Sequence, residues 1–157
     1  MRVHILAKRE FDKLMQVNDI TDENVEKFDS MIFISIVDTL CETNHFEKDH
    51  NNCITLKFDD VENDLEPSPT QIFSTKAFTK DQAKKLFDFI KANRDKEKCV
   101  VHCMAGISRS GAVGTFINGY AKGDWELFMR TNRNIMPNGR VHRMLNEAKY
   151  NDYENES

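Results

Sequence analysis

The residues best suited to chemistry lie in one stretch, where five residues separate a cysteine from an arginine. Cys103 ends an apolar run at residues 100–102, and Arg109 opens an amphipathic stretch. A loop between a strand and a helix points backbone N–H groups into one concavity, where the helix dipole adds positive field. Such a loop binds a tetrahedral dianion, and a guanidinium adds a planar fork for two phosphate oxygens. The spacing therefore predicts a phosphate-binding loop made of Met104, Ala105, Gly106, Ile107, Ser108 and Arg109.

The same field favours a thiolate, which makes Cys103 a candidate nucleophile. Cysteines so placed have pKa values lowered from about 8.5 to roughly 3.5–7.5. Ser110 offers a hydroxyl that can donate to the sulfur and ease its departure, and Gly106 supplies a backbone able to adopt positive φ. His102 has two interpretations that the residues leave open: it tunes Cys103 through hydrogen bonds, or it is a strand-end histidine that holds the shape of the loop.

A cysteine and an arginine at this spacing are a weak signal by themselves. The specificity comes from the histidine before them, the glycine between them, the Ser-Arg-Ser ending and the strand-then-helix context. The structural alternative is a small buried thiol at Cys103 and a surface side chain at Arg109. An arginine in the first turn of a helix opposes the helix dipole, so an anion is needed to justify it.

The elements around this loop indicate an α/β fold. Apolar runs predict strands at residues 3–6, 31–37, 53–58 and 98–102. Helical spacing and caps predict helices near 11–15, 21–28, from a Thr79 cap onward, 113–120, 124–133 and 140–150. We expect one domain over residues 1–150, with a central, mostly parallel sheet flanked by helices and the phosphate-binding loop between a strand and a helix. Residues 151–157 are expected to form an acidic, frayed tail.

Composition narrows the class further. The 157 residues carry a formal net charge of -4, with 39% hydrophobic and 31% charged residues, which argues against a nucleic-acid partner. The longest apolar run, 31–37, is too short to span a membrane, and the first ten residues are too charged for a signal peptide. We therefore expect a cytoplasmic, monomeric protein with free thiols, no metal and no cofactor.

The stretch from His102 to Ser110 resembles the signature loop of cysteine-dependent protein tyrosine phosphatases, in particular the compact dual-specificity type. The resemblance extends over about residues 32–145. Residues 133–138 resemble a downstream element that buttresses the loop, which implies a supporting role for Asn138. Met144 stands where members often carry a glutamine, so water positioning there is not implied. The resemblance implies a sheet flanked by helices, no metal and a phosphocysteine intermediate.

A general acid is expected on the long segment 59–78, which contains four candidates: Asp59, Asp60, Glu62 and Asp64. Cleavage of a phosphate ester needs a proton on the leaving oxygen. Alternation along the preceding strand does not choose between the first two. The family resemblance places the acid at the second aspartate, Asp60. The alternative is that Asp59 and Asp60 both cap the first turn of the loop.

These residues together predict a phosphomonoester hydrolase, a protein-tyrosine or dual-specificity phosphatase whose partner is a phosphotyrosine protein. One alternative is a phosphoinositide or other small-phosphate phosphatase, but the loop lacks the lysine that highly charged head groups favour. Another is a catalytically silent phosphate-binding module, although this chain keeps candidates for nucleophile, arginine and acid. Cys41 follows a strand expected beside that of Cys103, and it is either a resolving thiol or an ordinary half-buried cysteine.

Overall fold

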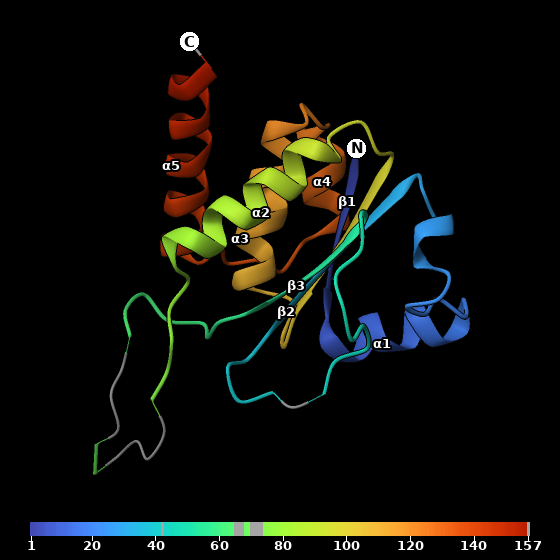
Figure 1. The fold of residues 1–157 in the computed structure, drawn as a ribbon, viewed down its shortest axis with the longest axis horizontal. Helices are drawn as coiled ribbons and strands as arrows, with labels where there is room; N and C mark the ends of the chain where they lie inside the picture. The colour runs from blue at the N-terminus through green and yellow to red at the C-terminus, as the bar shows by residue number, and fades with distance from the viewer. Residues whose placement is uncertain (42, 65–67, 70–73, 157) are drawn as a thin grey trace.

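The computed structural model describes residues 1–41, 43–64, 68–69 and 74–156. Four strands, five α-helices and one short 3₁₀ helix follow one another along the described chain (Figure 1). In order they are β1 (Arg2–Ala7), α1 (Lys8–Val17), η1 (Val25–Lys27), β2 (Met31–Val37), β3 (Cys53–Lys57), α2 (Lys80–Ala92), β4 (Lys98–Cys103), α3 (Arg109–Tyr120), α4 (Trp125–Thr131) and α5 (Gly139–Glu156).

The four strands form one parallel sheet in the order β1-β4-β2-β3. Ala7 at the end of β1 pairs with Cys103 at the end of β4, and Ser35 near the end of β2 pairs with His102. The carboxyl ends of the strands therefore meet at one edge, which is where α/β sheets carry their sites. The prediction of a single α/β domain with a parallel sheet is confirmed.

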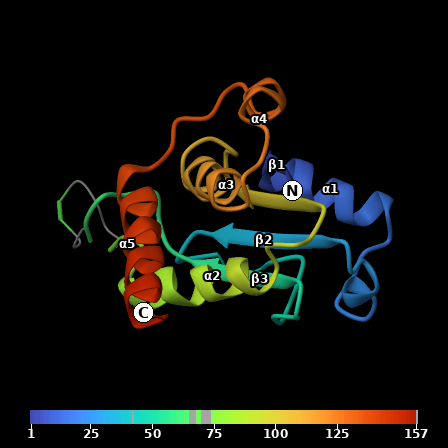
Figure 2. The ribbon, with the colours of Figure 1, turned by 90° about the horizontal axis from the view of Figure 1, so that it is seen from above.

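Helices cover both faces of the sheet. The helices α2, α3, α4 and α5 bury apolar side chains against one face, together with Ile32, Ile34 and Ile36 of β2. Phe33 points to the other face, where it packs with Phe11 of α1. Figure 1 shows α2 to α5 gathered together and α1 apart from them, and Figure 2 shows α5 and α1 at opposite ends of the view from above.

Local sequence explains most of these elements. The strand β2 is buried on both faces, which is why its residues form a nearly continuous apolar run. The helix α2 starts at a capping box, in which Thr79 Oγ1 accepts from Gln82 N at 3.1 Å and Gln82 Oε1 accepts from Thr79 N at 3.1 Å. A box of this kind satisfies two backbone N–H groups that the first turn leaves unpaired.

The outer edge of β1 is occupied by a side chain instead of a strand. Asn132, which follows α4, accepts a hydrogen bond from Ile5 N at 2.9 Å and donates one to Val3 O at 2.9 Å. The amide thus imitates the pairing of a neighbouring strand and covers an edge that could otherwise pair with another chain. It also fixes the segment after α4 along β1.

Two expected elements differ in the structure. Residues 21–28 contain only the single turn η1, since Asn24 accepts from Thr21 N and donates to Asp19 O instead of extending a helix. Helix α5 continues to Glu156, so residues 151–156 are helical and the expectation of a frayed tail is wrong there. Lys91 of α2 explains this, because its ammonium pairs with both Asp152 and Glu156. Both pairs link the end of α5 to α2.

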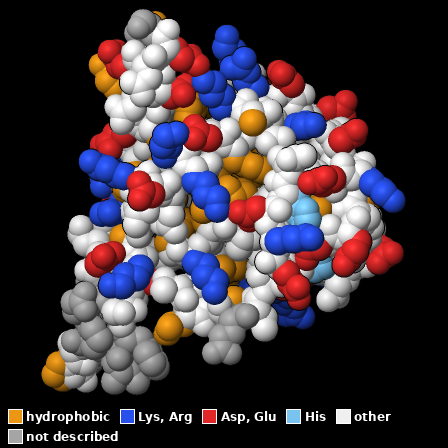
Figure 3. All heavy atoms as spheres, in the orientation of Figure 1, with side chains coloured by type: hydrophobic (Ala, Val, Ile, Leu, Met, Phe, Trp, Pro, Cys, Tyr) orange, Lys and Arg blue, Asp and Glu red, His pale blue; other side chains and the backbone are white. Residues whose placement is uncertain are grey.

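The surface and helices bear on the expected environment. No helix within the described residues is long and apolar enough to cross a membrane. Figure 3 shows Lys and Arg side chains interspersed with Asp and Glu over the face seen in Figure 1. On the described part of that face there is accordingly no continuous basic surface of the kind that tracks a nucleic-acid backbone.

Candidate active site

The loop from Cys103 to Ser108 joins the end of β4 to the start of α3. Gly106 has a φ of 71°, and a Cβ added there would lie 2.6 Å from Ala7 N and 2.7 Å from the carbonyl carbon of Leu6. Glycine is therefore required at this position both for its left-handed backbone and for the close approach of β1. The loop is held in place from that side by Lys8 N, which donates to Met104 O at 3.2 Å.

The sulfur of Cys103 lies among hydrogen-bond donors. Its Sγ is 3.0 Å from Ser110 Oγ and accepts from Gly106 N at 3.3 Å, and the residue is only 2% exposed. Burial by itself raises the pKa of the thiol, but hydrogen bonds from the Ser110 hydroxyl and from the backbone N–H groups of Ser110, Ile107 and Gly106 outweigh it. The pKa of Cys103 consequently lies below its ordinary value.

Two other buried cysteines show that this effect belongs to the loop and not to burial. Burial raises the pKa of Cys99, which lies on the same strand as Cys103, and it raises the pKa of Cys53 on β3 as well. Both thiols pack within the apolar clusters of the protein. All four cysteines are free, and of the three buried ones Cys103 alone has a lowered thiol pKa.

Arg109 is oriented by contacts on one side of its guanidinium. Its Nη1 donates to Phe58 O at 2.8 Å and lies 2.7 Å from Asp38 Oδ1. The side chain is only 5% exposed, yet its Nε is buried without a hydrogen-bond partner among the described residues. A buried charged donor without a partner is costly, so this nitrogen is suited to an anion that enters the loop.

Asp60 lies against the loop of residues 103–108. Its Oδ1 accepts from Ser108 Oγ at 2.8 Å and from Asn138 Nδ2 at 2.9 Å. Asp60 is exposed, so the carboxyl group can reach both solvent and a group bound in the loop. The structure thus brings the preferred acid candidate, the end of the loop and the supporting residue Asn138 together.

Asp59 has a different set of contacts. Its carboxylate accepts from Thr39 N at 3.0 Å, Thr39 Oγ1 at 2.8 Å and Lys76 N at 2.7 Å. Partial burial raises the pKa of this carboxyl group, but the bonds from Lys76 and Thr39 outweigh it and leave the pKa below its ordinary value. A carboxylate so fully occupied is suited to tying two loops together and poorly suited to carrying a proton.

The remaining two acid candidates, Glu62 and Asp64, make their described contacts within segment 59–78 and with α5. Asp64 Oδ1 accepts from Ala77 N at 2.8 Å, and the carbonyl of Glu62 accepts from Arg140 Nη1 at 2.9 Å. Arg140 Nε also donates to Phe78 O at 2.8 Å, so it joins the two ends of the described part of segment 59–78. Residues 65–67 and 70–73 of that segment lie outside the described residues.

Asn138 connects three parts of the site. Its backbone N donates to Ser108 O at 3.0 Å, its Nδ2 donates to Asp60, and its Oδ1 accepts from Val141 N at 3.0 Å. The last bond caps the first turn of α5 in the manner of an N-cap residue. The loop, the acid candidate and the start of α5 are therefore held together by one side chain.

His102 lies under the loop on the face that α1 covers. The side chain is fully buried, and the centroid of its ring lies 4.1 Å from that of Phe11 at an interplanar angle of 30°. Neither ring nitrogen has a hydrogen-bond partner among the described residues. Burial lowers its pKa to about 4. The imidazole is accordingly neutral near pH 7, and its packing against Phe11 agrees with the interpretation that it holds the shape of the loop.

We expect the stability of the protein to fall by about 2 kcal/mol between pH 7 and pH 5 because of His102. Its folded-state pKa is about 4, whereas an unfolded histidine has a pKa of about 6.5. Between these values the unfolded state binds more protons, so acid favours unfolding. The free energy of urea unfolding measured at both pH values in the native protein and in His102→Leu checks this, and an equal pH dependence in the two proteins would contradict it.

The sequence interpretation missed one residue of this site. Asp38, which pairs with Arg109, directly follows β2. Its place in the site could have been predicted from the sequence, because the carboxyl ends of parallel strands meet at one edge and β2 was expected beside β4.

Met144 is buried with the apolar side chains of α5. Cys41 donates to Thr43 O at 2.8 Å, and its role as a resolving thiol stays a prediction.

The arrangement combines four chemical capacities in one place: a thiol with a lowered pKa, backbone donors, an oriented guanidinium and a nearby carboxyl group. Within the described residues no group of three or more His, Cys, Asp or Glu side chains is placed to hold a metal ion. Anion binding and nucleophilic attack by sulfur are the reactions that these groups support together.

No protein-family model matches this chain, and no curated protein matches it. Among solved structures, the chain is similar to one described as the crystal structure of Tk-PTP in the active form. The two share 17% sequence identity, the similarity covers 96% of this chain and 92% of that chain, and the TM-score is 0.48. A likeness at this level carries no information on activity.

Proposed function

We propose that this protein hydrolyses phosphate monoesters, with phosphotyrosine in proteins as the substrate class, through a phosphocysteine intermediate on Cys103. The observation that carries the proposal is the combination of a thiol whose pKa is lowered by hydrogen bonds, Cys103, with the buried Nε of Arg109, which has no partner among the described residues. A phosphate group in the loop would accept from this nitrogen and from the backbone N–H groups around Gly106. The sulfur would then lie beneath the phosphorus atom.

In the first step the Cys103 thiolate attacks phosphorus. An S–P bond forms, the ester P–O bond breaks, and Asp60 gives its proton to the leaving oxygen, which departs as a phenol or alcohol. Charge spread over the equatorial oxygens in the loose transition state is stabilised by the loop N–H groups and by Arg109. Each of these groups is fixed before the reaction, so little reorganisation is required.

In the second step a water molecule attacks the phosphocysteine. Asp60, now ionised, takes a proton from the water as its oxygen bonds to phosphorus, and the S–P bond breaks to release inorganic phosphate. The sulfur leaves as a thiolate that Ser110 Oγ, 3.0 Å away, stabilises by donating a hydrogen bond. Both steps balance without a metal, cofactor or oxidant.

Asp60→Asn should lower kcat for an aryl phosphate with a poor leaving group by about 10²-fold or more, the usual worth of a general acid. The loss should be smaller with a good leaving group such as p-nitrophenol, because that group departs without a proton. The alkaline limb of the pH profile should also disappear. Steady-state kinetics with the two substrates from pH 5 to pH 9 check all three expectations.

Asp59→Asn is the matched control, since it makes the same change one residue earlier. Its carboxylate bonds to Thr39 and Lys76, so the variant should lose stability while keeping the leaving-group dependence of the native protein. If Asp59→Asn loses the alkaline limb and Asp60→Asn keeps it, the acid is Asp59 and the assignment is wrong.

A further inference from the structure

We propose that the rim of the phosphate-binding loop selects phosphotyrosine peptides that carry an apolar side chain next to the phosphotyrosine and a carboxylate farther along the peptide. The inference rests on the proposed function, because it concerns the residues that surround the same loop. Two features carry it, an apolar group of side chains on the loop and an uncompensated cation beside the loop.

The apolar rim consists of Met104, Ile107 and Met136. Their exposed fractions are 51%, 38% and 74%, which is high for side chains of this type. Met104 and Ile107 belong to the loop itself, and Met136 is tied to it because Met136 N donates to Ile107 O at 3.0 Å. Methionine is flexible and polarisable, so such a rim adapts to apolar side chains of different shapes.

The cation is Arg9, in the first turn of α1. This turn is fixed to the loop by the bond from Lys8 N to Met104 O. Cations are unfavourable at the start of a helix, where the dipole is positive. Lys8 is compensated by Asp12, whose Oδ2 lies 2.7 Å from its Nζ. Arg9 is exposed and has no ion pair with any described side chain, which leaves its guanidinium available to a ligand.

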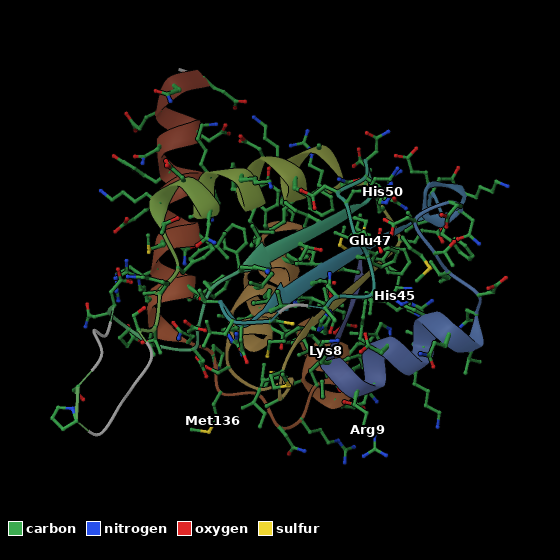
Figure 4. The ribbon with its side chains drawn as sticks, turned by 60° about the horizontal axis from the view of Figure 1, so that its bottom comes forward. Lys8, Arg9, His45, Glu47, His50 and Met136 are labelled. Carbon is green, nitrogen blue, oxygen red and sulfur yellow. The ribbon has the colours of Figure 1, made fainter. Side chains whose placement is uncertain are left out.

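Figure 4 looks toward the end of the sheet where these residues lie and shows Arg9, on α1, apart from Met136. A peptide whose phosphotyrosine enters the loop would pass over both. An apolar residue would bury surface on the methionines at about 25 cal/mol per Å². A carboxylate facing Arg9 would gain a partly screened ion pair.

The chemistry of the rim also separates a peptide from a polyphosphorylated lipid head group. Several phosphates would need several cations, but Lys8 is already paired and two carboxylates, Asp38 and Asp60, face the loop. Exposed methionines offer nothing to a polyanion. A peptide segment with a single phosphate, an apolar side chain and one carboxylate is the ligand that these side chains fit.

The test compares kcat/KM for four phosphotyrosine peptides. Each carries leucine or serine beside the phosphotyrosine. Each also carries glutamate or glutamine at the two positions that lie three residues before and three residues after it. Each value is divided by kcat/KM for p-nitrophenyl phosphate, which does not reach the rim. The native protein should favour the leucine–glutamate peptide over the serine–glutamine peptide by about tenfold or more, the equivalent of about 1.4 kcal/mol.

Two variants assign the preference to its residues. Arg9→Glu should remove or reverse the glutamate preference, and Met136→Glu should remove the leucine preference. The matched controls are Arg94→Glu, an exposed arginine after α2, and Met129→Glu, a methionine of α4 that is 52% exposed. Because each control makes the same charge change elsewhere, it should leave both preferences within twofold of the native values.

Equal ratios for all four peptides, or equal changes in variants and controls, would overturn the inference. A larger kcat/KM for a phosphoinositide than for every peptide would overturn it as well. Failure of the proposed function is distinguishable from both results, because p-nitrophenyl phosphate would then not be hydrolysed at all.

Discussion

Cys103→Ser is expected to lower kcat for an aryl phosphate by about 10⁴-fold or more while keeping the affinity of the loop for tungstate, an oxyanion that resembles phosphate. A serine hydroxyl stays protonated at neutral pH and is a far weaker nucleophile than the thiolate that this loop stabilises. The donors that we propose for the oxyanion are backbone N–H groups and Arg109, which the substitution leaves in place. Turnover measured beside tungstate binding by calorimetry separates the two effects.

The control is Cys99→Ala, which changes a buried thiol at the other end of β4. Burial raises the pKa of Cys99, so its thiol is not a nucleophile at neutral pH. This variant should keep kcat within a few-fold of the native value, even if it loses stability through the cavity that it creates. A comparable loss of kcat in both variants would mean that Cys103 contributes to activity through packing and not as a nucleophile.

Arg109→Lys is expected to lower kcat/KM by about 10³-fold, in the range found when a preorganised charged donor is lost from a transition state. Lysine keeps the positive charge but lacks the planar fork, so it cannot bond Phe58 O with one nitrogen and a phosphate oxygen with another. The Asp38 carboxylate would remain beside the shorter ammonium and would hold it away from the substrate. Steady-state kinetics at saturating and limiting substrate check this.

Arg130→Lys provides the comparison, because Arg130 is an exposed side chain near the end of α4. It should change kcat/KM by no more than twofold. An Arg109→Lys variant with native kcat/KM would show that the charge alone suffices and that the geometry of the guanidinium does not matter.

Much of the fold was predictable because each strand carries its own signal. The strand β2 is apolar throughout since both of its faces are buried, and the capping box at Thr79 defines where α2 begins. Short-range patterns of this kind are visible in one chain. Helix α5 was less predictable at its end, because its last turns depend on Lys91, a residue about sixty positions earlier.

The candidate site also has one part that the sequence predicts and another part that it does not. The loop from Cys103 to Arg109 is contiguous, so its residue types and spacing predict its shape. The different contacts of Asp59 and Asp60 were not predictable from alternation, because they depend on Thr39 and Asn138 from distant segments. Tertiary contacts of this kind, which involve residues far apart in the sequence, require the structure.

The most direct test of the central claim is to trap the phosphocysteine. Purified protein is mixed with an aryl phosphate, quenched in acid within the first turnovers, digested and analysed by mass spectrometry. The account predicts one added phosphoryl group on the peptide that contains Cys103, absent from Cys103→Ser and more abundant in Asp60→Asn when the leaving group is good, because hydrolysis of the intermediate then slows. Steady turnover of the aryl phosphate with no phosphoryl group on Cys103 at any quench time, or with the group on another residue, would contradict it.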